Sequence, residues 1–178
     1  FYPERYPKKP LMCKDERDLI IVRHAQAEPI AYSGLDFDRT LTGLGEEHAI
    51  LMARRVMSYD LKIDRFLCSP AIRTKMTALA FSREIGFQEN EILYLDELYE
   101  GTFQDYLNVL STLATNATII IGHNPAVQDL GNWLCGRHFQ DFPPSGMMHL
   151  RSSLNQIGNI SESDGILLRF EYPEIFKS

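Results

Sequence analysis

Cysteine is scarce in this sequence, and no residues have the spacing of a metal site. The three cysteines, Cys13, Cys68 and Cys135, are an odd number and lie far apart, with no C-x-x-C pair. This pattern does not fit a disulfide framework or a structural zinc site, so we expect reduced thiols. The five histidines likewise show no metal-ligand spacing. We therefore predict no metal and no cofactor.

Long hydrophobic runs and an excess of basic residues are also missing. No apolar stretch approaches the roughly 20 residues that span a bilayer, and no basic segment followed by an apolar run marks a signal peptide. With 18 Lys and Arg against 24 Asp and Glu, the formal net charge is −6, which argues against a broad surface for nucleic acid or anionic lipid. We expect a cytoplasmic protein with no nucleic-acid or membrane partner. Because the sequence starts at Phe1 rather than at Met, a native leader before this residue stays open. The sequence does not indicate an oligomeric state.

The length and composition are those of one globular unit. The 178 residues, 44% hydrophobic and 24% charged, suffice for one core and are few for two. Residues 1–10 combine aromatic residues, three prolines and several charges, which suits an extended arm better than a helix. We predict an N-terminal extended arm over residues 1–17 and a single domain over residues 18–178.

Strand and helix patterns alternate along this domain. β-Branched runs predict strands, and apolar residues at helical intervals, with Thr42 as an N-cap, predict helices. Ser69-Pro70 and Asn124-Pro125 each fit an N-cap followed by proline at the first helical position. The alternation predicts an α/β fold, a three-layer sandwich with a mainly parallel central sheet flanked by helices, to which the tail adds two edge strands. The expected strands are residues 18–22, 65–68, 92–95, 118–121, 147–153 and 166–172, and the expected helices are 42–59, 70–85, 103–113 and 125–135.

Two histidines directly follow strands of this expected sheet. Arg23 and His24 follow the first strand, and His123 follows the strand at 118–121. Because ligands of parallel sheets gather at the carboxyl ends of the strands, both imidazoles should face one crevice. Residues 29–40 have no clear periodicity and several charges, and we expect a loop over this crevice.

The charged side chains expected beside these histidines indicate a phosphoryl site. Arg73 lies in the first turn of the helix after the second strand, so its guanidinium should approach that of Arg23. Two planar guanidinium groups match pairs of phosphate oxygens, and the helix N-terminus at Asn124 would add amide donors. A neutral histidine is also a competent nucleophile toward phosphorus if its other ring nitrogen is held, typically by a backbone carbonyl. The pocket is therefore predicted to bind, and through an imidazole to transfer, a phosphoryl group.

Four segments of the sequence resemble the signature motifs of the histidine phosphatase superfamily, also called the phosphoglycerate mutase-like or RHG family. They are Arg23-His24-Ala25, Asp38-Arg39-Thr40-Leu41-Thr42-Gly-Leu-Gly45, Ser69-Pro70-Ala-Ile-Arg73-Thr74 and Gly122-His123-Asn124-Pro125. Their order matches that of the family, and four separate matches are far more specific than one. Ala25 departs from the glycine that is usual in the family. Its small side chain should still let a phosphoryl group approach.

The resemblance implies a phosphoglycerate mutase-like fold and a histidine phosphatase-like catalytic domain over residues 18–178. It implies His24 as the nucleophile and Arg23, Arg73 and His123 as ligands of the phosphoryl group. The short length and the motifs look most like the SixA-type phosphohistidine phosphatase branch. The expected partner is thus a phosphorylated substrate, either a phosphohistidine protein or a small phosphomonoester.

The sequence offers two candidates for the residue that protonates the leaving group. A phosphate ester needs its leaving alkoxide protonated, and ester-hydrolysing relatives carry a glutamate after the third strand. Glu97 best matches this position, and Glu100 is the second choice. Glu97 in the pocket would favour small esters, whereas Glu97 in solvent would favour phosphohistidine, whose leaving imidazole is far less basic. The remaining alternatives are a mutase, whose relatives are generally longer, and a non-catalytic module that binds phosphoryl groups.

Overall fold

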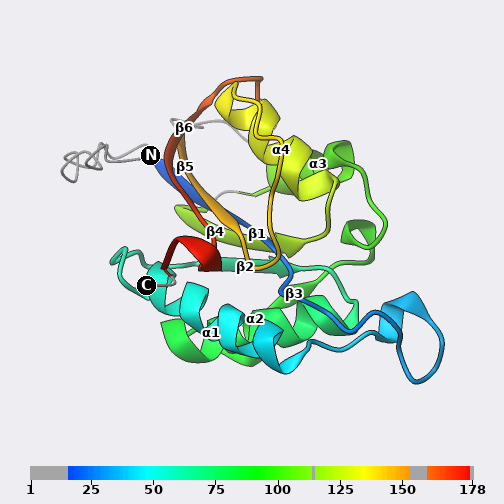
Figure 1. Cartoon of the computed structure of the whole chain (residues 1–178). Helices are drawn as coiled ribbons and strands as arrows, with labels where there is room; N and C mark the ends of the chain where they lie inside the picture. Colours follow the sequence, from blue (N-terminus) through cyan, green and yellow to red (C-terminus); the bar gives the residue numbers. More distant parts are fainter. Residues whose placement is uncertain (1–15, 114, 153–159, 177–178) are drawn as a thin grey trace.

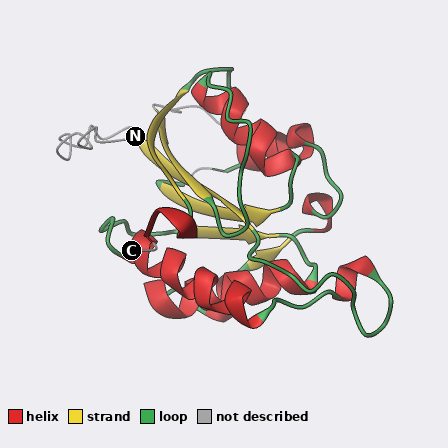
Figure 2. Ribbon diagram, in the orientation of Figure 1, coloured by secondary structure: helices red, strands yellow, loops and turns green. Residues whose placement is uncertain are grey.

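The computed structural model describes residues 16–113, 115–152 and 160–176, and it forms one six-stranded sheet between two layers of helices (Figures 1 and 2). The strands lie in the order β3-β2-β4-β1-β5-β6. The first four are mutually parallel, and β5 and β6 are antiparallel to their neighbours. The predicted α/β sandwich with a mainly parallel sheet is confirmed. The bounds are β1 Arg17–Arg23, β2 Arg65–Cys68, β3 Leu93–Tyr94, β4 Ala117–Gly122, β5 Met147–Ser152 and β6 Gly165–Glu171, and for the helices α1 Gly43–Met57, α2 Ile72–Ile85, α3 Phe103–Ser111 and α4 Ala126–Cys135.

The two helical layers cover opposite faces of the sheet (Figure 1). Successive side chains of a strand point to opposite faces, so the buried strand β4 contributes to two cores. Ile119 and Ile121 pack with Met52 of α1 and Phe81 of α2, whereas Ile120 packs with α3 and α4. This packing explains why the central strands appear in the sequence as unbroken apolar runs rather than as alternating ones.

The start of α1 is fixed by its cap and by a glycine. Thr42 accepts a hydrogen bond from the Gly45 amide at 2.9 Å, which confirms Thr42 as the N-cap. A Cβ at Gly45 would lie 2.1 Å from the carbonyl oxygen of Gln26, so only glycine lets α1 begin this close to the segment after β1. The Asp38–Gly45 motif therefore anchors a helix beside the chain that leaves His24.

Two helices begin later than predicted. α2 starts at Ile72 with Ala71 as the N-cap, because the Ser69 hydroxyl contacts His123 instead of capping the helix. α4 starts at Ala126 with Pro125 as the N-cap, since the Asn124 side chain is directed elsewhere. The Ser69-Pro70 and Asn124-Pro125 pairs thus belong to the turns between strand and helix. The side chains of Ser69 and Asn124 can therefore form contacts other than helix caps.

The tail differs from the prediction of two edge strands. β5 lies inside the sheet, paired to β1 on one side and β6 on the other, so that of these two strands β6 alone is an edge strand. The sheet also begins earlier, because Arg17 pairs with Ser152 and is therefore part of β1 rather than of the predicted arm. The rest of the predicted arm, apart from Glu16, lies outside the described residues, as does Cys13.

Candidate active site

The carboxyl ends of β1, β2 and β4 bring the predicted residues together. The ring centroids of His24 and His123 are 5.2 Å apart, with the ring planes at 60°. Arg73, in the first turn of α2, places Nη2 3.4 Å from Nδ1 of His123. The charge of Arg23 acts on both imidazoles and lowers the pKa of each. The two imidazoles and the two guanidinium groups therefore lie close together at the carboxyl ends of these strands, as predicted.

His24 is held in one tautomer by its own backbone turn. Its Nδ1 lies 2.8 Å from the carbonyl oxygen of Ala25. A carbonyl can only accept, so Nδ1 carries the proton and Nε2 of the neutral ring presents a lone pair. The Ala25 amide in turn donates to Thr77 Oγ1 at 3.1 Å, and the Ala25 side chain is fully buried. The alanine in place of the family glycine fits without disturbing the turn.

The environment of His24 keeps its ring neutral. Burial, together with the positive charges of Arg73 and Arg23 and against the opposing effect of the Ala25 carbonyl, lowers the pKa of His24 to about 4. The unperturbed pKa of histidine is near 6.5. His24 is therefore neutral near pH 7, which is the form a nucleophile needs.

His123 is oriented by two contacts that the sequence patterns did not predict. Its Nε2 lies 2.7 Å from the hydroxyl of Ser69, and its backbone amide donates to the hydroxyl of Tyr106 at 3.3 Å. A Cβ at Gly122 would lie 2.1 Å from that hydroxyl, so the glycine before His123 is what admits Tyr106. Burial, followed by the charges of His24 and Arg73, lowers the pKa of His123 to about 3.

A short segment after α4 braces the site from the side of β5. The Phe142 carbonyl accepts a hydrogen bond from Arg23 Nη1 at 2.7 Å. The amide of Ser145 donates to the carbonyl of His24, and the amide of Arg23 donates to the carbonyl of Gly146. Residues 142–146 therefore fix both the backbone of the nucleophile and the guanidinium beside it.

Several buried polar atoms of the site have no hydrogen-bond partner among the described residues. Among the described residues, the buried side-chain atoms without a hydrogen-bond partner include Nε of Arg23, Nε of Arg73 and Oγ of Ser145. Buried donors are normally satisfied, and an unpaired one destabilises the fold. A bound oxyanion would supply acceptors to these donors, so the pattern fits a phosphoryl group.

The side chain of Asn124 makes its hydrogen bonds within the protein, whereas the amide donors expected at the start of the helix that follows remain a prediction. Its Nδ2 donates to Gln128 Oε1 and to the carbonyl of Phe142, each at 3.2 Å. Because these two acceptors already engage the amide nitrogen, and because α4 begins only at Ala126, the geometry gives Asn124 the role of a brace between α4 and residues 142–146.

The predicted proton donors do not lie among the residues that contact the imidazoles. Glu97 and Glu100 are both exposed, and among the described residues neither carboxylate has a hydrogen bond or ion pair. Tyr99, between them, instead packs against His123 in a T-shaped arrangement, with the ring centroids 5.8 Å apart. The carboxylate whose charge reaches His123 is that of Asp36, from the loop over the site.

Other candidates from the sequence lie away from this site. His149 is buried in a separate polar cluster, 2.6 Å from Asp18 Oδ1. Cys68 is fully buried, which supports a packing role for its side chain, and Cys135 is a free thiol. Within the described part of the chain, no cluster of His, Cys, Asp and Glu has the composition to hold a metal ion. In the same part, every helix is too short or too polar to cross a membrane.

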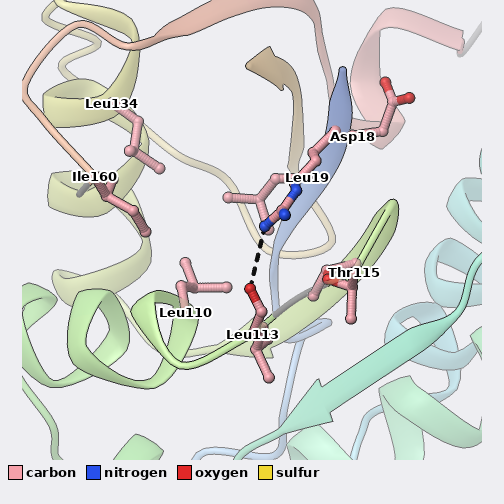
Figure 3. Close-up of a pocket in the computed structure, with 9 residues that line it drawn as sticks. Asp18, Leu19, Leu110, Leu113, Thr115, Leu134 and Ile160 are labelled. Atoms are coloured by element: carbon pink, nitrogen blue, oxygen red, sulfur yellow. Dashed lines mark hydrogen bonds between the residues drawn. The ribbon is translucent and has the colours of Figure 1, made fainter. Parts of the chain in front are cut away.

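A small apolar pocket lies near the amino ends of β1 and β4, at the other end of these strands from His24 and His123 (Figure 3). It is lined by Leu19 of β1, Thr118 of β4 and Leu110 of α3, and Arg17 closes it by donating to the Leu113 carbonyl at 3.2 Å. Leu19 and Thr118 lie near the amino ends of their strands, whereas His24 and His123 follow the carboxyl ends. This pocket is therefore separate from the candidate active site.

Comparisons with known proteins agree with this geometry. The sequence model of the histidine phosphatase superfamily (branch 1) matches residues 19–118. The structure of a protein assigned as phosphohistidine phosphatase SixA from Agrobacterium tumefaciens has a TM-score of 0.75 and 25% identity, covering 88% of this chain and 98% of that one. The protein histidine phosphatase SixA complexed with tungstate has a TM-score of 0.74 and 25% identity, covering 90% and 99%. An uncharacterized protein of Picosynechococcus sp. (strain ATCC 27264 / PCC 7002 / PR-6) is 28% identical over 160 residues, covering 85% of this chain and 94% of the relative.

The fold and the two pairs of basic side chains define an enzyme that acts on phosphoryl groups. Because the family model covers more than half of the sequence, the chain belongs to the histidine phosphatase superfamily (branch 1). It is a phosphatase, and its substrates are phosphorylated compounds.

Proposed function

We propose that this phosphatase removes the phosphoryl group from phosphohistidine in a protein through a covalent intermediate on His24. The observation that carries the proposal is the neutral His24 ring, with Nδ1 bound to Ala25 and Nε2 free, 5.2 Å from the ring of His123. The similarity to SixA structures supports the phosphohistidine substrate.

In the first step, the lone pair of His24 Nε2 forms a bond to phosphorus while the bond from phosphorus to the substrate nitrogen breaks. The electron pair of the broken bond stays on the substrate imidazole. In the second step, water attacks phosphorus, the bond to Nε2 breaks, and dihydrogen phosphate leaves the neutral His24 ring. Splitting one displacement into two is the ordinary advantage of a covalent intermediate.

The basic side chains act on the phosphoryl oxygens in both steps. Arg23 and Arg73 bring fixed donors, and His123 lies between Arg73 and the nucleophile. Negative charge spreads over the three equatorial oxygens in the transition state, so donors held in advance at those positions stabilise it. No metal or cofactor enters either step as proposed.

The proton balance distinguishes the two candidate substrates. A phosphohistidine protonated on its second ring nitrogen has the same bonding as phospho-His24, so transfer between the two imidazoles needs no net movement of a proton. An alkyl ester would need an acid for its alkoxide. The exposed position of Glu97 and Glu100 therefore supports the phosphohistidine protein over the small phosphomonoester.

We propose further that residues 18–178 form one catalytic domain, because the last two strands, β5 and β6, extend the sheet that carries the site, and the segment just before β5 contacts His24 and Arg23. β5 is paired with β1 along its length, and residues 142–146 just before it hold His24 and Arg23. A chain cut before β5 would lose these contacts.

Glu97→Gln tests the assignment of the substrate. We expect kcat on a phosphohistidine peptide to change by less than about twofold, because no carboxylic acid is needed for an imidazole leaving group, whereas loss of a true general acid costs about 10² or more. Hydrolysis of the peptide and of p-nitrophenyl phosphate is followed for the native chain, Glu97→Gln and the matched control Glu100→Gln. A loss of about 100-fold on the peptide in either variant would make that glutamate the acid and contradict the account.

The protonation of His24 can be measured directly by nitrogen NMR of its imidazole. Because the pKa is lowered to about 4, the ring should stay neutral with the proton on Nδ1 as the pH falls from 7 to 5, and gain its second proton only near pH 4. A lowered pKa extends the neutral, nucleophilic form to lower pH. Titration near the unperturbed value of about 6.5, or a proton on Nε2, would contradict the proposed nucleophile.

A further inference from the structure

Asp36 lies in the loop over the site and holds one end of the Arg73 guanidinium. Arg73 Nη1 donates to the backbone carbonyl of Asp36 at 2.6 Å, and Nη2 donates to its carboxylate Oδ2 at 2.9 Å. The Arg73 side chain is only 7% exposed, whereas that of Asp36 is 52% exposed. A buried guanidinium is thus tied to a loop residue that reaches it from the solvent side.

This contact determines which part of Arg73 remains for a ligand. Asp36 occupies one hydrogen on each of the two terminal nitrogens, while Nε is buried without a partner among the described residues. Guanidinium groups bind phosphate oxygens in pairs, through neighbouring N–H groups in one plane. With the end formed by Nη1 and Nη2 held by Asp36, and with Nη2 also 3.4 Å from Nδ1 of His123, the Nε–H group is the buried donor of Arg73 that is left for the phosphoryl group.

The Asp36 carboxylate is charged near pH 7. Hydrogen bonds from Arg39, then from Arg73, together with their positive charges, lower the pKa of Asp36 to about 2. Arg39 Nη1 lies 2.8 Å from Asp36 Oδ1, so the carboxylate lies between two arginines. Asp36 therefore cannot act as a general acid, and its effect on the reaction must pass through the groups that it contacts.

Asp36 also reaches the second imidazole through Tyr99. The Tyr99 hydroxyl donates to Asp36 Oδ2 at 3.3 Å, and the Tyr99 ring edge lies against His123. Phe37, the next residue of the loop, packs edge-on against the same tyrosine ring, with centroids 5.0 Å apart. One loop residue is therefore joined to both groups that flank the phosphoryl site.

We propose that Asp36 is a positioning residue for phosphoryl transfer, which holds Arg73 so that the Nε side of the guanidinium meets the phosphoryl oxygens. The inference rests on the proposed function of Arg73 as a phosphoryl ligand. It predicts that Asp36 acts on the transition state and that most of this effect passes through Arg73, the group that it contacts most closely.

The first test is the kinetics of Asp36→Asn, which keeps the shape and one acceptor but removes the charge. We expect kcat on a phosphohistidine peptide to fall by about 10- to 100-fold, with KM changed by less than about threefold, because misplaced donors cost transition-state rather than ground-state binding. The matched control is Asp38→Asn, on the same loop, whose carboxylate accepts from the Ser33 hydroxyl at 2.7 Å. The kcat of Asp38→Asn should stay within about twofold of the kcat of the native chain. A raised KM with unchanged kcat in Asp36→Asn would overturn the proposal.

The second test is a double-mutant cycle with Arg73→Ala. If Asp36 acts through Arg73, Asp36→Asn should lower kcat by less than about twofold when Arg73 is already absent, whereas independent effects would multiply. A structural role of the loop would leave the loss the same in both backgrounds and would also overturn the proposal. Circular dichroism of each variant verifies that it is folded.

The cycle also separates this inference from the proposed function. Turnover by the native chain tests the function, and the affinity of all four proteins for vanadate, a mimic of the transition state of phosphoryl transfer, tests the coupling without turnover. A native chain without turnover would refute the proposed function alone. Equal effects of Asp36→Asn on vanadate affinity with and without Arg73 would refute the positioning role alone.

Discussion

Replacing His24 by alanine is expected to lower kcat on a phosphohistidine peptide by about 10⁴-fold or more, the scale on which removal of a catalytic nucleophile acts. The reason is that the other imidazole of the site cannot replace His24 as the nucleophile. His123 presents Nε2 to Ser69 and Nδ1 to Arg73, so both of its ring nitrogens are already engaged. Phosphate release from the peptide and from p-nitrophenyl phosphate measures the loss.

The matched control for this variant is His138→Ala. His138 is exposed and lies in the segment after α4, away from the described contacts of the site. Its replacement should leave kcat within about twofold, the scale of a surface change outside a site. Equal rates for the native chain and His24→Ala would remove His24 from the mechanism.

Replacing Arg73 by alanine is expected to lower kcat/KM by about 10²- to 10³-fold, the cost of removing one preorganised donor group from a charged transition state. Arg73 is buried, lies beside His123 and keeps Nε without a partner. Arg73→Lys should recover only a small part of the loss. Lysine restores the charge but not the planar pair of donors.

Arg83→Ala is the matched control for this second prediction. Arg83 lies on the same helix, is 68% exposed and pairs with Glu89 at 2.8 Å. Its loss should change kcat/KM by less than about twofold, because exposed ion pairs contribute little. Full activity of Arg73→Lys would show that Arg73 contributes only charge, and the geometric role of its guanidinium would then be wrong.

The sequence predicted the sheet and the four central basic residues because both depend on local patterns. Buried parallel strands appear as short β-branched runs, and residues that directly follow them gather at one edge. His24 and His123 follow β1 and β4 in this way, and those two strands are paired along their length. Their meeting therefore required only the strand assignment and the parallel arrangement.

The residues that orient these side chains could not be predicted in the same way. Asp36, Ser69 and Tyr106 act through single long-range contacts, 37, 54 and 17 residues away from their partners. No periodicity marks such contacts, and Ser69 fits a helix cap equally well by local rules. Residues 142–146 show no helical or strand pattern, although they brace the nucleophile.

The two misplaced helix starts have the same physical cause. Ser69 and Asn124 follow strands and precede prolines, which is the local signature of a helix N-terminus. In the folded chain, His123 engages the serine hydroxyl and Phe142 accepts from the asparagine amide, so α2 begins two residues later and α4 one residue later than predicted. Local capping rules fail where a site takes the capping side chain for itself.

The most direct test of the central claim is to trap the phosphorylated enzyme. The native chain is mixed with a phosphohistidine peptide, quenched in base within the first turnover, digested and analysed by mass spectrometry. We expect one phosphoryl group on the peptide that contains His24, lost on brief acid treatment and absent when the same experiment uses His24→Ala. A phosphoryl group on His123 or on another residue, or turnover without any phosphorylated enzyme, would contradict this claim.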